Sequence, residues 1–239
     1  MIISTKAIVL SKLKYKDNDL IVKCYLEAKG IVSFVVKNAF SSKKGKLKPA
    51  YFQPLSMLQV EFDYKNSRDL HYFKNIRLLH SFQSLHTAIL KSTVVIFLAE
   101  ILSAVLKEEE ANPSLFSYIE TTFLWFDMID NSSIFHHKFL MGLTKYLGFF
   151  PELNKMNLPY FNIEEGKFQA MANSPYCIHG QKLILFNAVL GTKFDELKNH
   201  PMHATEKQDL LNMILLYFKL HLQGFKPPKS LSILNQVFN

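Results

Sequence analysis

The chain has 239 residues, of which 49% are hydrophobic, and it carries 28 Lys+Arg against 20 Asp+Glu, for a net charge of +8. This length is enough for one or two domains with a buried core, and the hydrophobic fraction excludes wholesale disorder. The two cysteines lie 153 positions apart, which excludes a disulfide framework and a four-cysteine zinc site.

The beginning of the chain, MIISTKAIVL, lacks the basic start, long apolar centre and small-residue cleavage site of a signal peptide. The most apolar stretch, residues 94–105, contains Glu100 and is shorter than the ~20 residues that span a bilayer. We therefore expect a soluble protein of a reducing, cytoplasmic compartment, without a membrane partner.

The excess of positive over negative charge is confined to the first third of the chain. Residues 1–80 hold 15 Lys+Arg and 6 Asp+Glu, whereas residues 81–239 hold 13 and 14. This asymmetry predicts a small basic domain at 1–80, followed by a larger, nearly neutral domain at 81–239. A basic domain favours a polyanionic partner, although lysines that only solubilise the surface would also explain a mild excess.

Short runs of Val, Ile, Phe and Tyr with a period of two residues dominate the first 80 positions. The polar breaks between them include Lys29-Gly30, where glycine can adopt the positive φ of a tight hairpin. Small antiparallel proteins avoid exposed edge strands by closing into a barrel, so we expect a five-stranded OB-type β-barrel. The predicted strands are 2–12, 20–27, 31–37, 55–64 and 70–76.

From residue 81 the apolar period becomes helical, which predicts an α-helical domain and an α+β fold class. Helices are expected at 81–108, after the cap Asn112, at 133–147 before Gly148, and at 181–190. A last long helix is expected from Thr205, with Gln208 as its capping-box partner. Between them, residues 161–168 predict a short β-hairpin inserted into this domain.

A lysine-rich loop is the strongest candidate site. Phosphates require positive charge and bases require aromatic faces, and this loop supplies both, so it predicts sequence-tolerant, salt-sensitive binding of single-stranded nucleic acid. The alternative is a solvated loop whose aromatic residues plug the barrel. The candidate DNA-binding residues are Lys37, Phe40, Lys43, Lys44, Lys46, Lys48 and Tyr51, with Lys12 and Lys14 from the preceding strand.

Other chemistry has little support. Cys177, His179, His200 and His203 offer soft ligands, but their spacing suits surface histidines better than structural zinc. The adjacent His136 and His137 are expected to point apart on a helix. The chain contains no nucleophile elbow, phosphate-binding loop or dinucleotide-binding glycine motif, so we expect neither enzymatic activity nor a cofactor.

The order of these features resembles the RecO family of bacterial recombination mediators. The matching stretches are Thr5-Lys6-Ala7-Ile8-Val9-Leu10, Tyr15 with Asp17 and Asp19, Leu26-Glu27-Ala28-Lys29-Gly30, Lys37-Asn38-Ala39, Leu147-Gly148-Phe149-Phe150-Pro151 and the hairpin 161–168. The resemblance implies a nucleoid-associated protein with an OB-fold that binds single-stranded and duplex DNA. It also implies strand annealing, help in loading RecA, and two partners: RecR and the C-terminal tail of single-stranded DNA-binding protein.

The chain departs from the family pattern in two places. Many members carry a four-cysteine zinc element after the Leu-Gly-aromatic stretch, but here only Cys177 lies in that region. We therefore expect a metal-free remnant of the element at about 152–180. Phe40 stands where relatives often have arginine, and could stack on a base instead.

Two functions of other classes remain open from the sequence. The helical domain is apolar enough to act as a protein–protein adaptor with a peptide groove. An RNA-binding OB protein is the other alternative, because lysine–phosphate and stacking contacts are common to DNA and RNA.

Overall fold

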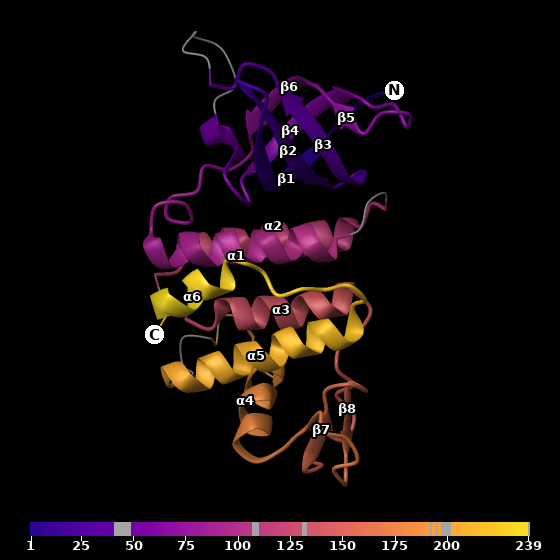
Figure 1. Cartoon of the computed structure of the whole chain (residues 1–239), viewed down its shortest axis with the longest axis vertical. Helices are drawn as coiled ribbons and strands as arrows, with labels where there is room; N and C mark the ends of the chain where they lie inside the picture. Colours follow the sequence, from indigo (N-terminus) through magenta and orange to yellow (C-terminus); the bar gives the residue numbers. More distant parts are fainter. Residues whose placement is uncertain are drawn as a thin grey trace. The chain divides into compact units, whose positions relative to one another are not determined.

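The computed structural model describes residues 1–40, 49–106, 110–130, 133–191, 193–194, 196 and 202–238 (Figure 1). The chain forms two compact units, Met1–Met128 and Ile129–Asn239. The first unit therefore includes two helices besides the β-sheet. The predicted domain boundary at residue 80 stays a prediction.

The first unit is built on a curled sheet of six strands in the order β5-β3-β2-β1-β4-β6 (Figure 1). All neighbours are antiparallel except β3 and β5. The strands are β1 (Ile2–Tyr15), β2 (Asp19–Leu26), β3 (Gly30–Val36), β4 (Met57–Asp63), β5 (Leu70–His71) and β6 (Phe73–Leu78), with a 3-10 turn at Pro49–Phe52.

The predicted OB-type sheet followed by helices is confirmed, with one more strand than expected. The predicted strand 70–76 is divided at Tyr72: β5 pairs with β3 at one edge, and β6 pairs with β4 at the other. Because one residue separates these two strands, the sheet has to curl until its edges meet. Phe73 accordingly stacks on Phe34 of β3, with ring centroids 4.0 Å apart.

The inner face of the sheet forms the hydrophobic core of the first unit. Alternate residues of β1, β2, β3 and β4 point inward, as a period of two requires. They include Val22, Phe34 and Phe62, all with 0% exposure. Phe62 meets Phe34 edge-on at 4.9 Å, a preferred arrangement for two aromatic rings.

The outer face of β1 and β2 is covered by α1 (Ile89–Val105) and α2 (Pro113–Met128). Lys6 of β1 donates to both carboxylate oxygens of Glu120 in α2, at 3.0 and 2.9 Å. Tyr25 of β2 donates to the carbonyl of Asn112 at 3.2 Å and packs against Phe116. These contacts hold α2 against the sheet, and Lys23 of β2 donates to the Ser103 carbonyl of α1 at 3.4 Å, so both helices belong to the same compact unit as the sheet.

The start of the first helix was predicted wrongly. Helix α1 begins at Ile89 rather than 81, because the preceding backbone is held in another conformation. The N–H groups of Gln83, Ser84 and Leu85 all donate to the Asp127 carboxylate, at 2.8–3.0 Å. The predicted cap of the next helix is confirmed, since Asn112 Oδ1 accepts the N–H of Leu115 at 2.9 Å.

In its described residues, the second unit contains four α-helices and a small sheet of order β8-β7-β9 (Figure 1). The helices are α3 (Phe135–Tyr146), α4 (Gly180–Gly191), α5 (Ala204–His221) and α6 (Leu231–Phe238). The strands are β7 (Tyr160–Asn162), β8 (Lys167–Gln169) and β9 (Cys177–Ile178). The predicted hairpin is confirmed by the pairing of Phe161 with Phe168, whereas α6 was not predicted.

Two helix ends of this unit test the capping predictions. Gly148 has a φ of 85°, and the N–H of Phe149 donates to the Thr144 carbonyl at 3.0 Å, so α3 ends where predicted in a Schellman motif. Helix α5 is capped at His203, two residues before the predicted Thr205, and Glu206 rather than Gln208 is the capping-box partner, accepting the N–H of His203 at 3.0 Å. Among the helices that the structure describes, none is long and apolar enough to cross a membrane.

Candidate nucleic-acid interface

The candidate site lies where β1 ends, β2 begins and β3 ends. Lys12 and Lys14 pair with Val22 and Leu20, two core residues, and paired residues share a face of the sheet. Both lysines therefore extend the inner face beyond the hydrophobic core, and both are exposed. Lys12 Nζ donates to the Pro49 carbonyl at 3.2 Å, and partial burial lowers its pKa.

Phe40 is brought to the same place by the turn that follows β3. Asn38 adopts a φ of 52°, and its N–H donates to Asp19 Oδ1 at 2.8 Å. The Phe40 ring is 47% exposed and lies 5.8 Å from Lys14 Nζ. An exposed ring beside an ammonium group suits a nucleotide, because the base can stack on the ring while the cation meets the phosphate.

The remaining predicted residues divide into three groups. Tyr51 is half-buried and packs against the core of the first unit. Lys37 directly follows β3, and its Nζ lies 5.0 Å from the ring of Tyr72. Lys43, Lys44, Lys46 and Lys48 lie outside the residues that the structure describes. The DNA-binding role of each residue in the predicted set stays a prediction.

Sequence reasoning missed Tyr72, which is 48% exposed. It lies between His71 and Phe73, whose rings both contact Phe34 in the core, so Tyr72 points to the outer face. The alternation of side chains along the strand 70–76 predicts this outward orientation of Tyr72. Lys16 Nζ lies 5.2 Å from the ring of Tyr15, a second lysine–aromatic pair at the end of β1.

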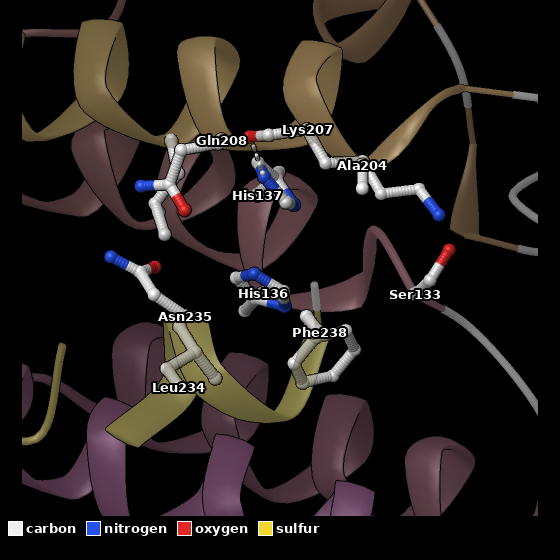
Figure 2. Close-up of a pocket in the computed structure, with 10 residues that line it drawn as sticks. Ser133, His136, His137, Ala204, Lys207, Gln208, Leu234, Asn235 and Phe238 are labelled. Atoms are coloured by element: carbon white, nitrogen blue, oxygen red, sulfur yellow. Dashed lines mark hydrogen bonds between the residues drawn. The ribbon is translucent and has the colours of Figure 1, made fainter. Parts of the chain in front are cut away.

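A small cavity in the second unit brings together two histidines that were expected to point apart. Figure 2 shows His136 and His137 of α3 projecting into the space between α5 and α6. Their ring centroids are only 4.1 Å apart, so that expectation is wrong. The cavity measures about 20 Å³, which is room for about one water molecule rather than an organic ligand.

The candidate metal ligands are not gathered around one point in the described part of the chain. Cys177 Sγ accepts a hydrogen bond from Gln169 Nε2 at 3.1 Å, and the ring of His179 lies against Tyr160. Within the described ranges, no group of three or more His, Cys, Asp or Glu side chains could hold a metal ion. His200 lies outside those ranges.

Comparison with known proteins covers the whole chain. Residues 1–82 match the family model "Recombination protein O N terminal", and residues 86–232 match "Recombination protein O C terminal". Proteins named DNA repair protein RecO are 43% identical over 238 residues in Christiangramia forsetii and 44% identical over 239 residues in Flavobacterium johnsoniae. A third, from Bacteroides fragilis, is 33% identical over 244 residues. Each alignment covers 100% of both proteins, and the chain therefore belongs to the RecO family.

Proposed function

We propose that this protein is a non-catalytic recombination mediator of DNA repair, which binds single- and double-stranded DNA, anneals complementary strands and helps load RecA. The observation that carries the proposal is the pairing of exposed aromatic rings with lysines at one end of the sheet, namely Phe40 with Lys14 and Tyr72 with Lys37. The printed name of its relatives, DNA repair protein RecO, supports the same role.

The chemistry of the site explains annealing without nucleotide hydrolysis. Lysine is a compact point charge that contacts phosphates without reading base edges, so binding is tolerant of sequence. Neutralising phosphates on two strands lowers their mutual repulsion, and base pairing then drives annealing. Released counterions make the affinity fall steeply as salt increases.

The helical part of the chain supplies the protein contacts in this proposal. Membership of the family supports RecR and the C-terminal tail of single-stranded DNA-binding protein as partners. Binding to DNA also implies work at the bacterial nucleoid. The experiment below separates this proposal from the adaptor and RNA-binding alternatives. An adaptor keeps its activity when the basic loop is changed, and an RNA-binding protein prefers RNA to DNA of the same sequence.

The test is a charge reversal of the loop. The fourfold variant Lys43→Glu, Lys44→Glu, Lys46→Glu, Lys48→Glu is expected to lose at least ~100-fold affinity for single-stranded DNA at low salt, with a flatter salt dependence. Fluorescence anisotropy with a labelled oligonucleotide measures both quantities. An RNA oligonucleotide of the same sequence shows whether the protein prefers DNA.

The matched control reverses four exposed lysines of the second unit, Lys145, Lys182, Lys219 and Lys226. It changes the net charge equally, so it separates local phosphate contacts from long-range attraction. The proposal expects the control to lose far less affinity than the loop variant. Equal losses, or an unchanged affinity in the loop variant, contradict the assignment of the loop.

A further inference from the structure

The small sheet of the second unit has strands too short to be stable by their pairing alone. β7 and β8 have three residues each and β9 has two, below the usual strand length of about 5–6 residues. An element of this size needs a further cross-link. In many members of the family a zinc ion bound by four cysteines supplies it, whereas residues 152–179 of this chain contain one cysteine, Cys177.

Apolar packing anchors one face of this sheet. The ring centroid of Phe161 in β7 lies 4.9 Å from that of Phe168 in β8 and 4.8 Å from that of Phe186 in α4. Ile178 of β9 pairs with Phe161 and shares this face. Since side chains alternate along a strand, the neighbours of these residues point to the opposite face. That face carries Tyr160, Gln169 and Cys177.

A hydrogen-bond hub centred on the Gln169 side chain lies on the opposite face. Gln169 Nε2 donates to the Met171 carbonyl at 2.7 Å and to Asn173 Oδ1 at 2.5 Å. It also donates to Cys177 Sγ at 3.1 Å, and the Cys177 thiol donates to Asn173 Oδ1 at 3.7 Å. An amide nitrogen carries two hydrogens, so the three acceptors share them. One atom of β8 thereby ties the loop after β8 to β9.

A second set of contacts ties the beginning of the element to the hairpin. The N–H of Glu152 donates to the Gly166 carbonyl at 2.9 Å, and the Glu152 carboxylate pairs with Lys167 Nζ at 3.4 Å. Asn162 Oδ1 accepts the N–H of Glu164 at 3.0 Å, which fixes the turn between β7 and β8. The beginning of the element, the hairpin and β9 are therefore all cross-linked by groups of this chain.

The side chains around the hub do not fit a structural zinc ion. Such an ion takes four Cys or His ligands, and only Cys177 and His179 are of these types within residues 152–179. The Cys177 thiol is engaged by Gln169, and the His179 ring lies 5.5 Å from the Tyr160 ring. Acidic side chains do not complete the set, because no three His, Cys, Asp or Glu residues among those described are placed to hold a metal ion.

We propose that the Gln169 amide takes the structural place of the zinc ion, and that residues 152–179 fold without a metal. Like a bound ion, the amide nitrogen joins groups from separate segments around one point. Each of its hydrogen bonds is weaker than a metal–ligand bond, and the aromatic face against α4 supplies the remaining stability. The proposal concerns the fold of this element and does not depend on the proposed function of the protein.

The metal content and chelator sensitivity of the full chain test whether the element folds without a metal. Protein without an affinity tag, purified from zinc-supplemented cells, is expected to hold far less than one zinc ion per chain in elemental analysis. Its thermal midpoint is expected to be the same with and without EDTA, because no metal contributes to folding. One zinc ion per chain, or a midpoint lowered by EDTA, overturns the proposal.

A substitution at the hub tests the role of the amide. Gln169→Met keeps the length of the side chain and removes both hydrogens, so it is expected to accelerate amide hydrogen exchange in β7, β8 and β9 by about 10-fold. Gln236→Met, at an exposed position of α6, is the matched control and is expected to leave these rates unchanged. Equal exchange rates of the small sheet in the two variants contradict the proposal.

A double-mutant cycle separates the hub from a general loss of packing. Cys177→Ala removes one acceptor, so it is expected to accelerate exchange less than Gln169→Met does. In the Gln169→Met background, Cys177→Ala is expected to add little, because the hydrogen bond that it removes is already absent. Additive effects of the two substitutions overturn the hub. If Gln169→Met does not fold, Asn173→Ala replaces it in the cycle, with the same expectation and the same contradicting result.

Discussion

At the scale of single residues, the buried histidine pair of α3 is an uncharged structural element. His136 and His137 are only 2% and 1% exposed, and His137 Nε2 lies 2.9 Å from the Lys207 carbonyl. Burial lowers the pKa of His137 to about 4, and burial beside His137 and Lys207 also lowers the pKa of His136. Both rings therefore stay neutral in the folded protein at neutral pH.

This pair predicts a loss of stability in acid. Because the folded pKa of His137 lies below its ordinary value of 6.5, the unfolded chain takes up the proton first as the pH falls. Stability is complete above pH ~6.5 and declines toward pH ~4, by about 2 kcal/mol between pH 7 and pH 5 for His137 alone. His137→Gln, which retains a donor toward Lys207, is expected to remove that share of the loss.

Urea unfolding followed by circular dichroism at pH 7 and pH 5 measures the effect. The control is His179→Gln, an exposed position whose variant is expected to lose as much stability in acid as the wild type. A His137→Gln variant that loses stability as steeply as the wild type contradicts the assignment. The sequence could not predict this site, because adjacent positions on a helix define where Cβ atoms point, not where packed rings converge.

At the scale of elements, the turn between β2 and β3 shows how much a single glycine determines. Gly30 has a φ of 70°, as its place in a tight turn predicts, and a Cβ atom there would lie 2.7 Å from the Glu110 carbonyl oxygen. The turn therefore requires glycine both for its backbone conformation and for the close approach of another segment.

Gly30→Ala is expected to destabilise the first unit by more than the ~1–2 kcal/mol that a left-handed conformation costs an ordinary residue. Urea unfolding followed by the fluorescence of Trp125, which lies in α2, measures the stability of this unit. Asn38→Ala is the matched control, because Asn38 also has a positive φ of 52° but is exposed. Equal losses in the two variants would refute the contribution of the backbone clash.

The elements that local patterns specify were predicted well, and those that distant contacts specify were not. Strand alternation and Gly148 identified the sheet and the end of α3 because period and capping are local properties. Asp127 accepts backbone N–H groups from residues more than forty positions away. Nothing in the sequence around residue 89 therefore predicts that α1 begins at Ile89. Helix α6 has only eight residues and a single buried one, Leu234, and follows two prolines.

At the scale of the whole molecule, sequence and packing divide the chain at different places. The family models separate between residues 82 and 86, whereas the compact units separate after Met128. The ion pair of Lys6 with Glu120 and the contact of Tyr25 with Phe116 join α2 to the sheet. The composition identifies the basic segment 1–80. The structure shows that its lysines lie on both faces of the sheet.

The most direct test of the mediator function is the rate at which complementary DNA strands anneal. With two labelled oligonucleotides at low salt and no nucleotide triphosphate, the wild type is expected to accelerate annealing, and added salt is expected to abolish the effect. The fourfold Lys43, Lys44, Lys46 and Lys48 to Glu variant is expected to anneal no faster than the strands alone. A wild type that binds both strands without accelerating their annealing would contradict the proposed function.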